Sequence, residues 1–399
     1  MTHTSQRIQV IDAIRGIALF GILVFNIQTY ALFAFLEPSQ VDQLQLDQPQ
    51  SYAPLQFVFH VLVNAQFYTI YSFLFGLGFY MLTQKNEQLG LNSTKIFKSR
   101  LWILLLLGLI HGLIFWFGDI LHKYALFGFT LLYFNKKSTK TLYQWMAGIM
   151  LFSAVLRTVI IFLTPPNTDS HEISPVIMQV LNTWQHGSFA AVVGMQKLGV
   201  AMLWFMGLKN GLSGIAHYLV MFILGLIAGK SNFFLRIPAL KQKMLKIAFF
   251  VFPLALLLKA FASLNILGIQ VLEGLPEPWQ ESIISLANFI AVPFIAVCYL
   301  IFLSVFLFES TSIIFKWISN AGKIGLTNYL MQTVLCMILF YGYALGFSGK
   351  LTLLETFIWV IPIYCFQLLF STIWLRYYKT GLVENLWRKL SSALVSKTS

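Results

Sequence analysis

The amino-acid sequence predicts an all-α, polytopic transmembrane helical bundle of about ten spans, with its N and C termini in the cytoplasm. Three observations support this prediction. The 399-residue chain is 58% hydrophobic and only 10% charged, with a mean hydropathy of +0.76. Apolar runs of about 20 residues, each long enough to cross roughly 30 Å of hydrocarbon as a helix, recur along the whole chain. Basic and acidic loops alternate between these runs, which is the signature of membrane topology.

Hydropathy and length define the expected spans. The first run carries Asp12 and Arg15 and is too long for a secretion signal, so we expect it to be retained as a span. Pro165 and Pro166 should end the fifth span, because proline disfavours helix in the residue before it. The ten expected spans are 8–36, 55–83, 100–117, 119–135, 142–163, 212–229, 244–264, 282–308, 324–346 and 352–378.

The region 178–208 is also apolar, but polar residues such as Gln196 and Lys197 interrupt it. Counting it as a full span would break the alternation of loop charge. We therefore expect an interfacial or re-entrant helix here. The chain should form a single integral membrane domain, with five-helix parts over 1–163 and 212–399 joined by an outer loop over 164–211.

The net charge of +13 raises the question of a nucleic-acid partner. The positive residues lie in alternate loops, however, and this distribution indicates membrane orientation instead. We expect the lipid bilayer and a small-molecule substrate as partners, and no nucleic acid.

The segment Gly108 to Tyr124 holds the best candidates for a functional site. Ionisable groups near the centre of a bilayer are costly and persist mainly where they have a role. His111 should lie near mid-membrane, where it can act as a general base, a nucleophile or a proton relay. Asp119 follows at Gly118; it can cap the next helix, or fold back to orient a histidine or a substrate. Tyr124 would hydrogen-bond a polar ligand nearby.

Further polar residues share faces of predicted spans. Asp12 and Arg15 are one helical turn apart, so they either pair with each other or present Arg15 to a phosphate-bearing ligand. Polar residues four positions apart either line a cavity or form hydrogen bonds between helices. These pairs are His60 with Asn64, and Asn328 with Gln332.

Several enzyme classes are excluded by missing motifs. The sequence has no P-loop, no dinucleotide-binding glycine fingerprint, no HExxH zinc pair and no G-x-S-x-G nucleophile elbow. Its three cysteines lack metal-ligand spacing. We expect no metal and no bound cofactor, so catalysis would depend on polar groups inside the bundle and a diffusible or membrane-borne donor.

Five stretches of the sequence are Asp12 to Leu23, Phe73 to Gly78, His111-Gly112 with Gly118 to Leu121, Gly322 to Gln332, and Trp374 to Arg388. Together and in this order they resemble the YeiB-type family of bacterial inner-membrane proteins, and the likeness spans nearly the whole chain. His122-Lys123 departs from the family pattern, in which less charged residues usually follow Gly-Asp-Ile-Leu.

The early helices of this family are similar to those of a wider group of transmembrane acyltransferases. That group includes O-acetylases of bacterial surface polysaccharides and a lysosomal enzyme that N-acetylates heparan glucosamine. These enzymes move an acyl group from a cytoplasmic thioester to an acceptor on the other side, using an intramembrane histidine. The resemblance implies an inner-membrane protein and makes acyl transfer the first hypothesis.

In this hypothesis the phosphates of a cytoplasmic acyl-CoA bind at Arg15, Lys98 and Arg100. His111 acts as general base or transient acyl carrier, and Asp119 orients the histidine or the acceptor. The second hypothesis is a transporter of a small polar or amphipathic solute. Its pathway would be lined by polar residues of the spans, namely Asp12, His60, Asn64, His111, Asp119 and Asn328.

Overall fold

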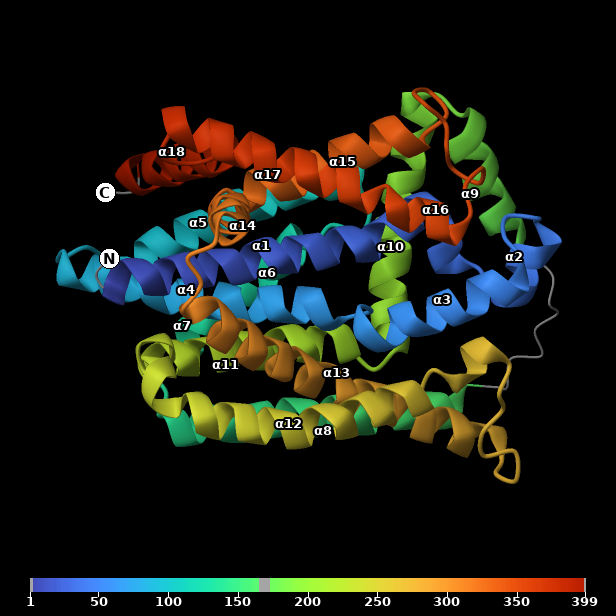
Figure 1. Cartoon of the computed structure of the whole chain (residues 1–399), viewed down its shortest axis with the longest axis horizontal. Helices are drawn as coiled ribbons and strands as arrows, with labels where there is room; N and C mark the ends of the chain where they lie inside the picture. Colours follow the sequence, from blue (N-terminus) through green and yellow to red (C-terminus); the bar gives the residue numbers. More distant parts are fainter. Residues whose placement is uncertain (1–2, 165–172, 398–399) are drawn as a thin grey trace.

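The computed structural model of the chain describes residues 3–164 and 173–397. Its long helices lie side by side along one direction, and the two ends of the chain emerge at the same end of the bundle (Figure 1). Within the described ranges all regular structure is helical. The predicted all-α bundle is therefore confirmed. The predicted end of the fifth span at Pro165 and Pro166 lies outside the described residues.

The helices before the outer loop begin with α1, which lies at the centre of the bundle. Two of the elements are short irregular turns of helix, the 3₁₀ turn η1 and the π-turn η2. The bounds are α1 (His3–Tyr30), η1 (Phe33–Phe35), α2 (Pro38–Gln43), α3 (Pro49–Leu62), α4 (Gln66–Gln88), α5 (Ser93–Ile110), η2 (His111–Phe115), α6 (Leu121–Gly128), α7 (Thr130–Phe134) and α8 (Thr139–Leu163).

The second half of the chain starts with two helices in the outer loop region and ends with an amphipathic helix. The bounds are α9 (Pro175–His186), α10 (Phe189–Lys209), α11 (Ser213–Lys230), η3 (Phe233–Leu235), α12 (Ile237–Phe261), η4 (Leu264–Leu267), α13 (Glu277–Phe308), α14 (Ile313–Lys323), α15 (Gly325–Phe340), α16 (Leu353–Ile358), α17 (Val360–Tyr377) and α18 (Leu382–Lys397).

Within the described residues, nine helical segments are long and apolar enough to cross a membrane. A tenth candidate is the pair α14 and α15, whose axes meet at 86°. The chain is thus a multi-pass membrane protein. Most predicted spans match a segment within a few residues, because uninterrupted apolar sequence of this length has few alternatives to a spanning helix.

The predicted span 119–135 differs from the structure. These residues form two short helices, α6 and α7, and neither reaches spanning length. The reason is that the turn before α6 lies inside the protein, where Trp116 is 1% and Asp119 0% exposed. Helix α6 therefore starts inside the bundle, and α6 and α7 need to cover only part of the membrane thickness to return to the side from which α5 came.

Helix α10 runs across the direction of the long helices (Figure 1). By length and composition alone it could span a membrane. Its direction in the bundle instead suits a helix that lies along the membrane, and it packs on the π-turn η2. α9 and α10 together cover the region 178–208 for which we expect an interfacial or re-entrant helix.

Close helix packing around α1 explains two glycines of the family-like stretches. A Cβ atom on Gly322 would lie 1.8 Å from the carbonyl oxygen of Asp12, and one on Gly16 would lie 2.3 Å from that of Ile318. Any larger residue would force α1 and α14 apart. Arg15 of α1 and Lys323 of α14, next to this contact, line one cavity.

Candidate functional site

A helical hairpin with its turn inside the bundle brings the first site residues together. α5 passes into a single widened turn that begins at His111, where the N–H of Trp116 donates to the His111 carbonyl at 2.8 Å. Such π-turns are frequent at functional sites. Trp116 has extended backbone angles, and the chain turns back at Gly118. As a result Asp119 lies beside His111, although eight residues separate them.

Two glycines permit this hairpin. A Cβ atom on Gly108 would lie 2.3 Å from the backbone nitrogen of His122, so a larger residue would push α6 away from α5. A Cβ atom on Gly112 would lie 3.4 Å from Cβ of Asp119, at the edge of ordinary contact. The small-residue spacing of Gly108 and Gly112 thus allows the return helix to pack against the outgoing one.

Asp119 is fully buried and is surrounded by donors. Its Oδ1 lies 2.8 Å from Nδ1 of His111. Its Oδ2 lies 2.8 Å from Nδ1 of His122 and accepts the backbone N–H of His122 at 2.9 Å. A buried carboxylate without partners would be very costly, and these three hydrogen bonds compensate for its loss of water.

The hydrogen bond from Trp204 defines the state of His122. An indole nitrogen only donates, and Nε1 of Trp204 lies 3.2 Å from Nε2 of His122. Nε2 of His122 must therefore carry the lone pair, which leaves the proton on Nδ1, where it faces Asp119. His122 is thus held as a neutral donor. Trp204 belongs to α10, so the helix that runs across the bundle contacts the buried site directly.

On the other side of Asp119, His111 continues the chain of hydrogen bonds to Thr333 of α15. Nε2 of His111 lies 2.9 Å from Oγ1 of Thr333. Hydroxyl, imidazole and carboxylate follow one another in the order that activates a hydroxyl group in acyl-transfer enzymes of unrelated folds. His111 and Thr333 are each 4% exposed. We refer to His111, Asp119, His122, Trp204 and Thr333 as the Asp119 network.

An outer cavity of about 310 Å³ lies against this network. Asp119 and Lys123 are both among its lining residues, although the carboxylate of Asp119 is itself buried in the network. Aromatic and apolar side chains form much of the remaining wall. The other side chains with an amide or hydroxyl group that line it are Asn26, Thr29, Tyr68, Tyr218 and Tyr329.

An inner cavity of about 300 Å³ lies toward the chain termini. Three basic residues line it, Arg15, Arg100 and Lys323. Glu384 of α18 also lines the cavity, but its Oε1 already accepts the N–H groups of Leu326 (2.7 Å) and Thr327 (3.1 Å). The cavity therefore offers cationic groups at the end that the basic loops assign to the cytoplasm.

Three residues line both cavities: Ile22, Ile120 and Tyr329. The hydroxyl of Tyr329 accepts the N–H of Ile120 at 3.4 Å, and its ring centre lies 5.3 Å from that of His111. A thin septum thus separates two cavities that approach the Asp119 network from opposite ends of the bundle.

The structure brings some predicted site residues to these cavities. Arg15 and Arg100 line the inner cavity, whereas Lys98 is exposed and is not among its lining residues. Asp12 does not reach a cavity wall as a free carboxylate, because its Oδ1 pairs with Arg15 at 2.6 Å. Tyr124 lines the inner cavity, and its hydroxyl lies 2.8 Å from Oγ of Ser72.

Other predicted residues form hydrogen bonds between helices. Asn328 donates to Oγ of Ser371 at 2.8 Å, and Gln332 donates to Oε1 of Gln367 at 3.0 Å. The sequence left two alternatives for Asn328 and Gln332, lining a cavity or joining helices by hydrogen bonds. These contacts correspond to the second.

His60 and Asn64 contact each other at 3.1 Å, between Nδ1 of the histidine and the amide nitrogen. They flank the outer cavity, because Val63 and Ala65 line it. Neither of the two is itself among the lining residues.

The sequence did not identify Thr333 and Trp204 of the Asp119 network, or Lys323 of the inner cavity, as site residues. Thr333 lies four residues after Tyr329, hence on the same face of α15, but threonine in an apolar helix usually bonds its own backbone. Trp204 lies in an apolar run with no polar neighbour on its side. His122 was visible, and its position three residues after Asp119 was the available signal.

The chain is similar over nearly its whole length to curated bacterial proteins. It is 29% identical to "Uncharacterized protein YxaH" of Bacillus subtilis (strain 168), over 97% of this chain and 94% of that protein. It is 29% identical to "Uncharacterized protein YeiB" of Escherichia coli (strain K12), over 98% of each. The family described as "Protein of unknown function (DUF418)" matches residues 228–393. No solved structure matches the chain significantly.

Proposed function

This chain belongs to the YeiB-type family of membrane proteins, and we propose that it is an inner-membrane acyltransferase of a bacterial cell. It would move an acyl group from a cytoplasmic acyl-CoA to a hydroxyl or amine of an outward-facing sugar or envelope component. The observation that carries the proposal is the hydroxyl–imidazole–carboxylate chain of Thr333, His111 and Asp119, next to Tyr329, which lines both cavities.

The inner cavity supports a donor with phosphate groups. Arg15, Arg100 and Lys323 line it, and guanidinium and ammonium groups recognise phosphate through charge-assisted hydrogen bonds. The apolar residues deeper in the same cavity suit an acyl chain. With CoA held at the basic end, the thioester would lie toward Tyr329.

The outer cavity supports a polar acceptor. Lys123 offers a hydrogen-bond donor and Asn26 offers an amide group, and aromatic rings line other parts. This mixture is typical of a site that binds a hydroxylated molecule.

The chemical step needs a base for the acceptor group. Asp119 accepts the N–H at Nδ1 of His111, so the lone pair at Nε2 of His111 faces the hydroxyl group of Thr333. The hydroxyl or amine of the acceptor gives its proton to Oγ1 of Thr333 as the Thr333 proton passes to Nε2 of His111. The acceptor oxygen or nitrogen attacks the thioester carbonyl, a C–O or C–N bond forms, and the C–S bond breaks. His111 then returns the proton, again through Thr333, to the departing CoA thiolate.

A transporter is the second candidate, and the septum of Ile22, Ile120 and Tyr329 favours it. Two cavities divided by a thin wall also describe alternating access, in which the wall opens on one side at a time. The two functions differ in outcome, because a transporter moves its solute without making a covalent product.

The test uses purified, detergent-solubilised protein with radiolabelled acetyl-CoA, and with octanoyl-CoA as a longer donor. Release of CoA stimulated by cell-envelope extract, or label on the protein, that is lost in His111→Ala would support acyl transfer. Absence of both with either donor, in protein whose thermal unfolding is normal, would overturn it. Solute uptake by reconstituted vesicles would then be measured.

A further inference from the structure

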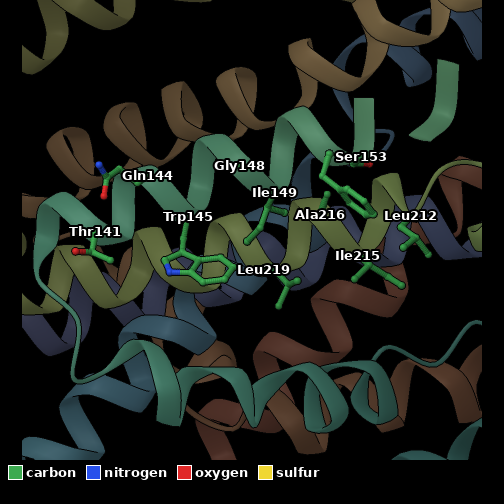
Figure 2. A pocket seen from close by; sticks show the side chains of 11 residues that line it. Thr141, Gln144, Trp145, Gly148, Ile149, Ser153, Leu212, Ile215, Ala216 and Leu219 are labelled. Carbon is green, nitrogen blue, oxygen red and sulfur yellow. The ribbon is translucent and has the colours of Figure 1, made fainter. Parts of the chain in front are cut away.

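A groove of about 530 Å³ lies between α8 and α11, apart from the Asp119 network. Figure 2 shows its lining side chains along the two helices. Most of them are apolar, with Trp145, Ile149 and Phe152 from α8 and Ile215 and Leu219 from α11. Nothing in the proposed reaction uses this groove.

The groove faces the surroundings of the bundle. Only 11% of the apolar window of α8 is buried within the protein, and Phe152 is 63% exposed. In a multi-pass membrane protein an apolar helix face with this exposure contacts lipid. An apolar hollow on such a face is filled by hydrocarbon chains, because water there would find few polar partners.

The two ends of the groove differ. At one end Ser153 donates to the carbonyl of Gly211 at 2.6 Å, which closes the space between the helices beside Leu212. At the other end lie Thr141 and Gln144 (Figure 2). The groove follows α8 from Thr141 to Ser153, roughly 18 Å of helical rise. It is therefore long, narrow and closed at the outer end.

Basic residues stand at the open end. The turn between α7 and α8 carries Lys136 and Lys137, and Lys140 lies in the first turn of α8, immediately before Thr141. Lys230 at the end of α11 donates to the carbonyls of Asn135 (2.7 Å) and Lys137 (2.8 Å), which holds this turn against α11. Nζ of Lys137 lies 4.4 Å from the ring centre of Tyr133, and no ion pair between described residues neutralises any of the three lysines. Their positive charge is therefore available to an external anion.

We propose that this groove binds an anionic phospholipid of the cytoplasmic leaflet. One acyl chain lies between α8 and α11 and ends near Leu212, and the phosphate faces Lys136, Lys137 and Lys140. Trp145, in the second turn of α8, lies at the depth where indole rings favour the membrane interface. The apolar length fits the chain and the charge fits the headgroup, whereas a peptide or soluble partner would need polar groups along the groove.

The chain offers matched variants for the test. A Cβ atom on Gly148, in the groove, would meet no heavy atom within 4 Å, and the same holds for Gly194 on α10. Gly148→Phe therefore fills the groove without a clash at Cβ, and Gly194→Phe is the control on another apolar helix. Replacing Lys136, Lys137 and Lys140 with Gln removes the headgroup contacts without altering the groove.

The experiment is native mass spectrometry of the delipidated full chain with dioleoylphosphatidylglycerol or dioleoylphosphatidylcholine. We expect the wild type to prefer phosphatidylglycerol, and the lysine variant to lose about fivefold in affinity per charge removed. Gly148→Phe should lose both lipids, and Gly194→Phe neither. Equal binding of the two lipids by the wild type, or unchanged binding by Gly148→Phe, would overturn the proposal. If Gly148→Phe fails to fold, the lysine variant decides.

Discussion

The bundle buries two polar clusters that are built in opposite ways. In the Asp119 network, all four ring nitrogens of His111 and His122 have a hydrogen-bond partner. In the second cluster, between α11, α12 and α13, Lys259 is 1% exposed and donates to the amide oxygen of Asn288. There Nε2 of His217 lies 2.9 Å from the carbonyl of Phe289, but Nδ1 of His217 has no partner among the described groups.

The clusters also differ in their surroundings. Asp119 lines the outer cavity, whereas neither Lys259 nor His217 is among the lining residues of the four cavities described for the chain. Burial of an ionisable group is therefore not what distinguishes the candidate site. The distinguishing features are complete pairing of its polar atoms and a cavity beside them.

The largest contrast should appear in stability. Asp119→Ala leaves two buried imidazole donors without an acceptor, and we expect it to lower the free energy of unfolding by about 3–5 kcal/mol. Lys259→Met replaces a buried cation with an apolar side chain of similar length, and we expect a change of about 1 kcal/mol or less, or a gain. Thermal unfolding in detergent measures both. A larger loss from Lys259→Met would contradict the comparison.

A smaller effect is expected at Thr333. Thr333→Val keeps the shape of the side chain but removes the hydroxyl that faces His111, and we expect acyl transfer to fall about tenfold. Thr333→Ser retains the hydroxyl and should restore most of the rate. If valine and serine gave equal rates of CoA release, the hydroxyl would have no part in the reaction.

The smallest effect is expected at Trp204. Trp204→Phe keeps an aromatic ring but removes the N–H that donates to His122, so it should cost about 1 kcal/mol of stability. Because Nε2 of His122 then has no donor, the imidazole ring is no longer held in one orientation toward Asp119, and acyl transfer should fall by about twofold to fivefold. A rate of CoA release identical to that of the wild type would show that Trp204 does not position His122.

Much of the bundle could be predicted from sequence because apolar length and loop charge are direct consequences of the membrane. The hairpin turn was only one of two alternatives from the sequence, since Gly118 permits a break but Trp116 and Phe117 continue the apolar pattern across it. Eight residues of straight helix would separate His111 and Asp119 by roughly 12 Å. Only the π-turn and the bend at Gly118 bring them to 2.8 Å, and neither has a periodic signal in the sequence.

The site was partly visible for a related reason. His111 and Asp119 stand out because charge is rare in apolar segments, and the same rarity drew attention to Asp12, which pairs with Arg15. Lys98 was a candidate because it lies in a basic loop, and it is not among the lining residues of the inner cavity. Thr333 and Trp204 are ordinary residues in apolar helices. Their part in the network depends on α15 and α10 meeting the hairpin, which is information about packing and not about local sequence.

The most direct test of the central claim is a double-mutant cycle on CoA release from acyl-CoA, with envelope extract as the acceptor source. The variants are His111→Ala, Asp119→Asn and the two combined, each checked for normal thermal unfolding. If the two residues act as one unit, the double variant should be no slower than the slower single variant. Rate losses that multiply, or turnover retained in His111→Ala, would contradict the account.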